Sequence, residues 1–264
     1  MTRVATPSVS ITPLPAFSDN YLWLLERAGH AVVVDPGDAA PVQRALAERK
    51  LKLDAILVTH HHGDHVGGLA ALRPTGATVY GPRAEAIDGV DVPLAAGDRV
   101  EVLGVSFSVL EVPGHTSGHI AYFAGALEPP VLFCGDTLFA CGCGRLFEGT
   151  PAQMLASLDR LSALPAATRV YCAHEYTLAN IRFALAVEPA NAELQQRARD
   201  AALVRERGEP TVPSTIALEL ATNPFMRSDA PDVRNAASAR AGASTGTDRV
   251  RTVTTIRKWK DEFR

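Results

Sequence analysis

The 264-residue chain is poor in features that would assign it at once to several protein classes. It has four cysteines, too few for the disulfide framework of a secreted domain of this length. Its formal net charge is -3, so it lacks the basic excess expected of a protein that wraps nucleic acid. The first twenty residues contain no apolar run of seven, so neither a signal peptide nor a membrane span is predicted. We therefore expect a cytoplasmic protein with no nucleic-acid or membrane partner.

The cysteines also argue against a structural zinc knuckle. Cys141 and Cys143 are separated by one residue, whereas ligand pairs in such knuckles are usually separated by two to four. With Cys134 and Cys172, they are interpreted as reduced thiols with structural roles.

Short apolar segments closed by turn residues dominate the chain up to about residue 172. Such segments are typical of buried strands, and they cover 31–34, 55–58, 105–112, 131–133 and 170–172. Helices are predicted over 41–50 and 151–164, each beginning at a proline, which suits the first turn of a helix.

The composition changes beyond residue 174. Residues 191–207 are rich in strong helix formers, and a further helix is predicted over 216–220. Small polar residues over 236–247 predict a mobile loop. The sequence thus predicts a mixed α/β domain over 1–173, followed by a smaller helical domain over 174–264.

Metal-ligand side chains are concentrated in THHHGDH, which holds four of the eight histidines. In an extended segment His60 and His62 face the same way, whereas His61 points elsewhere. After the glycine the chain can turn, so that Asp64 and His65 begin a helix and reach a second point.

Further candidates follow three other predicted strands. Residues distant in sequence that follow strand ends can converge on one site in a layered fold. A lone His or Asp after a strand is more often a cap or turn residue, but seven together favour a metal centre. Imidazole and carboxylate ligands suit zinc, iron or manganese, and seven exceed the needs of one four-coordinate ion. Two ions sharing a carboxylate would use all of them: His60, His62, Asp64, His65, His115, Asp136 and His174.

Two such ions would hold a hydroxide between them, which is a nucleophile for an activated carbonyl or phosphoryl group. His30 and His61 are interpreted as ordinary surface or turn residues. His119 is interpreted as a hydrogen-bonding partner of a ligand.

Longer motifs resemble a known family. The metal-ligand order resembles the metallo-β-lactamase superfamily: HHHGDH at 60–65, GHTSGH at 114–119, GDTLF at 135–139 and CAHEYT at 172–177. Other motifs are similar to its hydroxyacylglutathione hydrolase (glyoxalase II) branch: PAFSDNYLWLL near the start, VDPGDA at 34–39, GCGRLFEGT at 142–150, ALAVEPAN at 184–191, TNPFMR at 222–227 and IRKWKDEF at 256–263.

The resemblance implies an αββα sandwich with a C-terminal helical domain that helps to bind glutathione. It implies two divalent ions per monomer, zinc favoured and iron or manganese as alternatives. One ion would be held by His60, His62 and His115, the other by Asp64, His65 and His174, with Asp136 as the bridge; Asp64 and Asp136 are the expected catalytic carboxylates.

The implied reaction is hydrolysis of S-D-lactoylglutathione to glutathione and D-lactate by the bridging hydroxide, the second step of methylglyoxal detoxification. A thiolate is a good leaving group, so a strong general acid is not required. Cationic and hydroxyl donors suit the two glutathione carboxylates, and by similarity these are Arg145, Tyr176, Arg257 and Lys260. Without the family, residues 257–260 would be interpreted as the solvated face of a terminal helix. Some family members have Lys at position 145 and Tyr at position 147; Phe147 cannot supply that hydroxyl.

Three alternatives remain at the level of sequence. A glutathione persulfide dioxygenase on the same fold would hold a single iron and leave the second group of ligands unused. A β-lactamase or lactonase function would leave the C-terminal extension unexplained. A metal-storage or nucleic-acid-binding module is the alternative that agrees least with the negative net charge of the chain.

Overall fold

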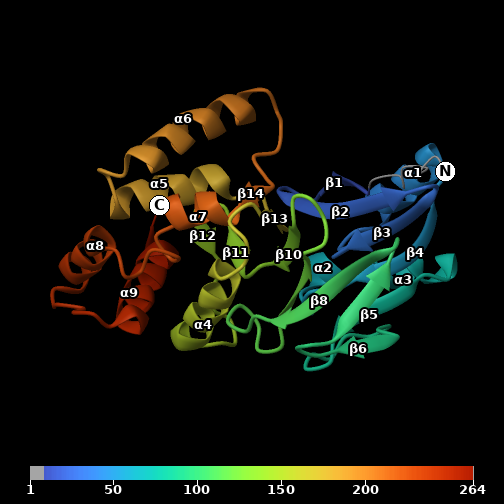
Figure 1. Cartoon of the computed structure of the whole chain (residues 1–264), viewed down its shortest axis with the longest axis horizontal. Coiled ribbons are helices and arrows are strands. Elements are labelled where there is room, and N and C mark those ends of the chain that lie inside the picture. Colours follow the sequence, from blue (N-terminus) through green and yellow to red (C-terminus); the bar gives the residue numbers. More distant parts are fainter. Residues whose placement is uncertain (1–8, 264) are drawn as a thin grey trace, which may run out of the picture.

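The computed structural model describes residues 9–263 and contains two six-stranded sheets packed face to face (Figure 1). In the first sheet the order is β1-β2-β3-β4-β5-β6; β1 to β3 are antiparallel, and β3 to β6 are parallel. Its strands are β1 (Ser10–Ala16), β2 (Asn20–Arg27), β3 (His30–Val34), β4 (Lys52–Leu57), β5 (Thr78–Pro82) and β6 (Val92–Leu94).

The second sheet has the order β14-β13-β10-β9-β8-β7, in which only β10 and β13 pair in parallel. Its strands are β7 (Arg99–Val102), β8 (Val105–Glu111), β9 (Ile120–Ala124), β10 (Val131–Gly135), β13 (Arg169–Cys172) and β14 (Ser214–Thr215). A separate small hairpin is formed by β11 (Leu138–Phe139) and β12 (Gly142–Cys143).

The alternation of side chains along β2 explains the layers. Trp23 and Leu25 face the core between the sheets, where Phe107 of the second sheet also lies. Leu22 and Leu24 point to the other face and pack with residues of the first helices. Successive strand residues face opposite sides, so one strand can serve both cores. The outer helical elements of this half are α1 (Ala39–Arg49), α2 (Gly63–Val66), α3 (Leu69–Leu72) and η1 (Arg73–Thr75).

A further helix, α4 (Pro151–Ser162), covers the second sheet, and its apolar residues belong to the same hydrophobic cluster as the residues of that sheet. Thr150 caps it by accepting a hydrogen bond from the Gln153 backbone, while the Gln153 side chain accepts from the Thr150 backbone. Pro151 occupies the first turn, as the sequence predicts. The αββα sandwich is therefore confirmed.

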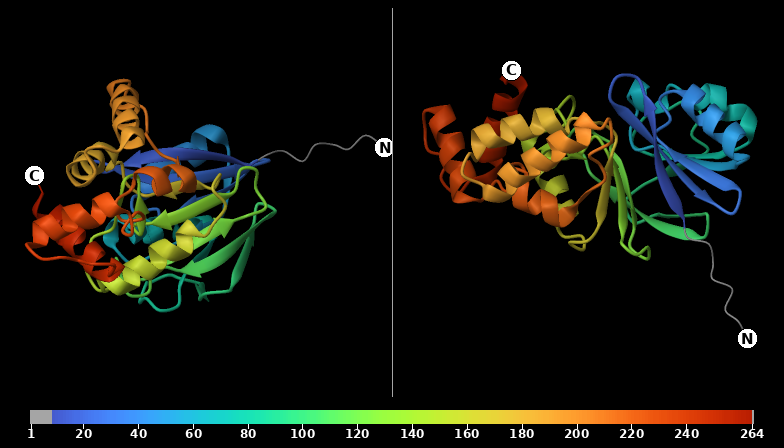
Figure 2. Two further views of the ribbon diagram at one scale, coloured as in Figure 1. Left: turned by 60° about the vertical axis from the view of Figure 1, so that its left-hand side comes forward. Right: turned by 90° about the horizontal axis from the view of Figure 1, so that it is seen from above.

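The C-terminal helices gather at the end of the molecule opposite α1 (Figures 1 and 2). The expected loop over 236–247 is wrong for its first half, because residues 236–241 complete a helix that packs against the last one. That helix ends at Gly242, whose φ of 64° closes it in the left-handed conformation. The helices are α5 (Thr177–Val187), α6 (Ala192–Glu206), α7 (Ile216–Thr222), α8 (Pro231–Ala241) and α9 (Arg249–Glu262).

The strand directions bring four strand ends to one edge of the sandwich. Both β8 and β10 are antiparallel to β9, and β13 is parallel to β10, so all three end on the same side. The end of β4 lies on this side too: the amide of Ile120, which pairs with the last residue of β8, donates to the carbonyl of Thr59, just after β4, at 3.0 Å. The first sheet also meets the end of β13, because the Tyr21 amide in β2 donates to the Ala173 carbonyl at 2.7 Å. Among residues 9–263, no helix is both long enough and apolar enough to cross a membrane.

Candidate functional site

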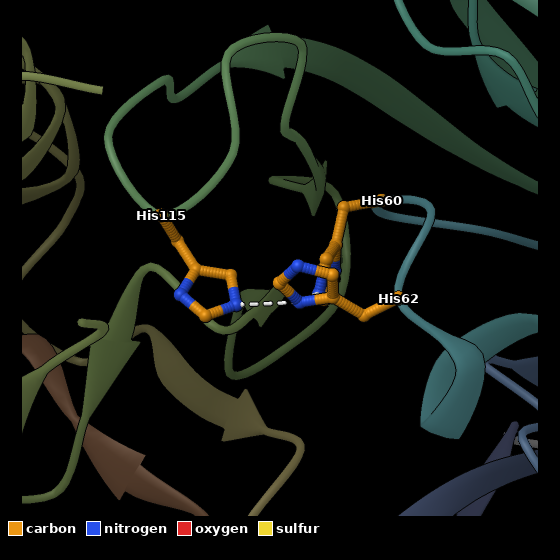
Figure 3. Close-up of side chains that lie close together, drawn as sticks. All are labelled: His60, His62 and His115. Atoms are coloured by element: carbon orange, nitrogen blue, oxygen red, sulfur yellow. Dashed lines mark hydrogen bonds between the residues drawn. The ribbon is translucent and has the colours of Figure 1, made fainter. Parts of the chain in front are cut away.

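Three imidazoles converge at this edge. His60 and His62 follow β4, and His115 lies in the loop after β8. The Nε2 atoms of His60 and His115 lie 3.2 and 3.0 Å from Nδ1 of His62, and in Figure 3 a dashed line joins ring nitrogens of His62 and His115. Nitrogens bound to one tetrahedral zinc at 2.0–2.1 Å stand about 3.3 Å apart. The three ring nitrogens thus have the spacing of ligands around one ion.

A second group lies beside the first. Asp64 and His65 are in α2, as expected, and His174 follows β13. The Asp64 Oδ2 atom lies 3.4 Å from His174 Nε2 and 3.7 Å from His65 Nε2. A close backbone contact holds this turn in place: a Cβ atom on Gly37 would stand 1.8 Å from the Asp64 carbonyl oxygen, so only glycine fits there.

Asp136 stands between the two groups. Its Oδ2 atom lies 3.4 Å from Nε2 of His115 in the first group and 3.4 Å from Nε2 of His174 in the second. Its Oδ1 atom lies 3.5 Å from His65 Nε2. One carboxylate therefore faces both sets of ring nitrogens.

Unpartnered buried atoms test whether this centre fits a metal. Both ring nitrogens of His65 and Oδ1 of Asp136 are buried and form no hydrogen bond. Asp35 Oδ2 lies 3.1 Å from His65 Nδ1, but at an angle that gives no hydrogen bond. Buried polar atoms in proteins nearly always have partners. A donor set of imidazole nitrogens and carboxylate oxygens with such unpartnered atoms fits divalent metal ions.

The electrostatics of the ion-free chain follow from burial and charge pairing. Burial alone would raise the pKa of Asp136, but the attraction of His65 and His174 outweighs this effect and holds the pKa well below its usual range. Burial lowers the pKa of His65, yet the carboxylates of Asp136 and Asp35 raise it to about 9. Burial and the surrounding histidines keep the pKa of His60 well below its usual value. His60 is thus neutral, as a ligand imidazole must be.

The opposite ring nitrogens of two candidate ligands have fixed partners. His174 Nδ1 lies 2.8 Å from Asp19 Oδ1, and His115 Nδ1 lies 2.8 Å from the Arg145 carbonyl oxygen. Such contacts orient a ligand imidazole and select its tautomer. Asn20 similarly donates to Asp64 Oδ2 at 3.0 Å. The sequence arguments did not single out Asp19 or Asn20.

Asp35 was also missed, although a signal was present. It follows β3 as the candidate ligands follow their strands, and its carboxylate accepts hydrogen bonds from the Thr59 amide and hydroxyl, both at 2.7 Å. It therefore braces the residue immediately before His60.

The remaining histidines have different surroundings. His119 is fully buried, stacks on His60 and accepts a hydrogen bond from the Asp136 amide at 3.2 Å, as a partner of the centre would. His30 pairs with Asp54 at the surface. His61 contacts two glutamates, and its ring meets that of His62 edge-on with the centroids 5.0 Å apart.

A cavity of about 750 Å³ opens onto the centre, and the four predicted substrate residues line it. The Tyr176 ring stacks on His174, with ring centroids 4.7 Å apart. Arg257 is only 8% exposed, so this face of α9 is not solvated. Burial and Arg257 lower the pKa of Lys260 to about 8. The cavity lining includes Arg145, Tyr176, Arg257 and Lys260, together with His62, Asp64, His115, Asp136 and His174.

Phe147 also lines the cavity, and its ring meets those of His62 and His115 edge-on at 5.4 and 5.3 Å. It is 61% exposed, so it forms an apolar rim at the opening.

Comparison with known proteins covers nearly the whole chain. Residues 17–88 and 75–174 match the metallo-beta-lactamase superfamily, and residues 175–263 match the hydroxyacylglutathione hydrolase C-terminus. The hydroxyacylglutathione hydrolase of Pseudomonas aeruginosa is 58% identical over 259 residues, which is 97% of this chain and 100% of that protein.

Solved structures share the architecture. The crystal structure of ETHE1 from Myxococcus xanthus is 29% identical, with a TM-score of 0.65 over 96% of this chain and 91% of that chain. The structure of TTHA1623 in a di-iron-bound form is 28% identical, with a TM-score of 0.57 over 82% of this chain and 100% of that chain.

Proposed function

Because the chain belongs to the hydroxyacylglutathione hydrolase (glyoxalase II) family of the metallo-β-lactamase superfamily, we propose that it hydrolyses S-D-lactoylglutathione to D-lactate and glutathione. This would be the second step of methylglyoxal detoxification. The observation that carries the proposal is the position of Asp136, whose Oδ2 atom lies 3.4 Å from a ligand nitrogen of each group, beside a cavity lined by cations.

Two divalent ions per chain are part of the proposal, with zinc favoured and iron or manganese as alternatives. When bound, they would supply a hydroxide nucleophile at neutral pH and polarise the thioester carbonyl. His60, His62 and His115 would hold one ion, Asp64, His65 and His174 the other, and Asp136 would face both. The di-iron form of a structural relative supports a pair of ions in this fold.

The chain's own residues would bind and orient the substrate. Arg145, Arg257 and Lys260 would pair with the two glutathione carboxylates, since charge-assisted hydrogen bonds are the strong ones. Tyr176, stacked on His174, would offer its hydroxyl beside the centre. Phe147 would shield the reacting carbonyl from bulk water at the rim. The thiolate leaves without protonation by a strong acid.

The rival reaction is oxidation of a persulfide at a single iron. The presence of Asp64, His65 and His174 with their ligand atoms within 4.8 Å of one another favours the two-ion hydrolase. One iron per chain and oxygen uptake would instead favour the rival.

The remaining proposals concern the context of the reaction. We take the protein to act as a cytoplasmic monomer on a small-molecule substrate. We take residues 1–173 as the catalytic part and 174–264 as the part that helps to bind glutathione; residues 1–8 and 264 lie outside the described region.

A comparison of two thioesters tests this function. Purified protein of measured metal content is assayed with S-D-lactoylglutathione and with a D-lactoyl thioester of N-acetylcysteamine, which lacks the glutathione carboxylates. We expect kcat/KM to favour the glutathione thioester by about 100-fold or more, since each lost charged contact costs about 1.5–3 kcal/mol. Equal turnover would overturn the proposed binding role of the four cavity residues. Failure to hydrolyse either thioester with both ions bound would overturn the reaction.

A further inference from the structure

Glu85 lies between β5 and β6, outside the two groups of candidate ligands, yet its side chain is only 2% exposed. Its Oε2 atom accepts a hydrogen bond from the His61 amide at 2.6 Å and lies 2.9 Å from His61 Nδ1. The carboxylate therefore holds both the backbone and the ring of the residue between His60 and His62.

The other oxygen of Glu85 contacts a different loop. Its Oε1 atom accepts hydrogen bonds from the Thr116 hydroxyl and from the Gly118 amide, the latter at 3.1 Å. These residues follow His115 directly. Gly118 permits the approach, because a Cβ atom there would stand 2.5 Å from Glu85 Cγ. One carboxylate thus ties the loop after β4 to the loop after β8.

A second connection runs beside the first. His61 Nε2 lies 3.3 Å from Glu148 Oε1, and Glu148 Oε2 accepts a hydrogen bond from the Ser117 amide at 2.8 Å. His61 is therefore more than the ordinary surface or turn residue that the sequence suggested. Its ring links Glu85 and Glu148, and both carboxylates hold the loop that carries His115.

The burial of Glu85 decides how much this connection matters. An exposed ion pair contributes little to stability, but a buried carboxylate with four donors facing it becomes costly to disturb. Its removal leaves the His61 and Gly118 amides without their acceptors. The loops would then shift relative to each other, and metal–ligand bonds tolerate errors of only about 0.2 Å.

We propose that Glu85 is a positioning residue: by joining the loop of His60 and His62 to the loop of His115, it sets the spacing of the three ring nitrogens and thereby their affinity for a metal ion. The inference rests on the proposed function, since it takes this group to hold an ion. It assigns Glu85 no contact with substrate.

Zinc affinity tests the proposal without relying on turnover. Zn²⁺ is titrated into the metal-free full chain in competition with a chromophoric chelator, for wild type, Glu85→Ala, Glu85→Gln and Glu101→Ala, an exposed glutamate in β7. For Glu85→Ala we expect the affinity for one of the two ions to fall about 10- to 100-fold, the usual effect of removing a partner behind the ligands. Glu85→Gln should be intermediate, because its amide oxygen can accept from the His61 amide but its nitrogen cannot accept from Gly118. Glu101→Ala should match wild type.

Thermal unfolding of each metal-free protein separates positioning from general stability. If Glu85→Ala lowers the unfolding temperature but its Zn²⁺ curve superimposes on that of wild type, the inference is overturned. If Glu85→Ala does not fold, folded Glu85→Gln decides the matter: wild-type affinity overturns the inference, and weakened affinity supports it. Absence of Zn²⁺ binding by wild type would overturn the proposed function itself, which is a distinguishable result.

Discussion

Asp19 holds His174 in place: its Oδ1 atom accepts a hydrogen bond from His174 Nδ1 at 2.8 Å, across 155 positions of the sequence. This contact fixes a ring proton on Nδ1 and turns Nε2 toward the carboxylates of Asp64 and Asp136, at 3.4 Å each. The orientation of a candidate ligand near the middle of the chain thus depends on a loop near its start.

Replacing Asp19 with alanine should therefore weaken the centre without removing a candidate ligand. We expect metal affinity and kcat to fall about 10- to 100-fold, because the ring loses the partner that fixes its tautomer. Glu101→Ala, at an exposed position of β7, is the control. Metal titration and steady-state kinetics measure both effects, and wild-type values for Asp19→Ala would show that His174 does not need this partner.

Replacing Asp136 with alanine should have a larger effect. It removes the carboxylate that faces both groups, so kcat/KM should fall by more than about 100-fold, and fewer than two ions per chain should remain after gel filtration. Asp232→Asn, on an exposed position of α8, is the control. Near-normal hydrolysis by folded Asp136→Ala protein would rule out the bridging role.

Asp261 accepts hydrogen bonds from Arg257 Nη2 at 2.9 Å and from Arg145 Nε at 3.2 Å through the same oxygen. Its negative charge therefore lies where a substrate carboxylate would bind. Asp261→Asn keeps an accepting oxygen but removes the repulsion, so KM should fall about threefold to tenfold with kcat unchanged, since about 1 kcal/mol corresponds to fivefold. An increase in KM would mean instead that the charge of Asp261 is needed to orient the two arginines.

Lys260 should give substrate binding a pH dependence. Burial and the neighbouring Arg257 lower its pKa to about 8, so the cationic form is lost as the pH rises through 8. KM should then rise by up to about tenfold between pH 7 and pH 9, because only the ammonium attracts the carboxylate. Lys260→Arg, which stays charged over this range, should abolish the rise. A flat KM in wild type would rule out a Lys260 that both titrates near pH 8 and binds the carboxylate.

Much of the fold follows from local patterns in the sequence. The apolar segments ended by turn residues predict β3, β8, β10 and β13 to within a few residues, because each buried strand must be apolar and must stop where the chain turns. Residues 236–241 were wrongly expected in a loop. Four of these six residues are alanine, the strongest helix former, so the segment has a local preference for helix that its small side chains concealed, and it also packs against α9.

The order of the candidate ligands could be recognised because each ligand directly follows a strand, and because alternation along the chain separates His61 from His60 and His62. What the sequence by itself determined was therefore several of the buried strands and of the helices, the donor types and the family. Only the tertiary structure decided which residues stand behind them: Asp19 behind His174, Glu85 behind the three-histidine group and Asp261 between Arg145 and Arg257. Each of these carboxylates lies in a segment whose local pattern is ordinary, and its partner is brought to it only when the two sheets and the C-terminal helices pack together.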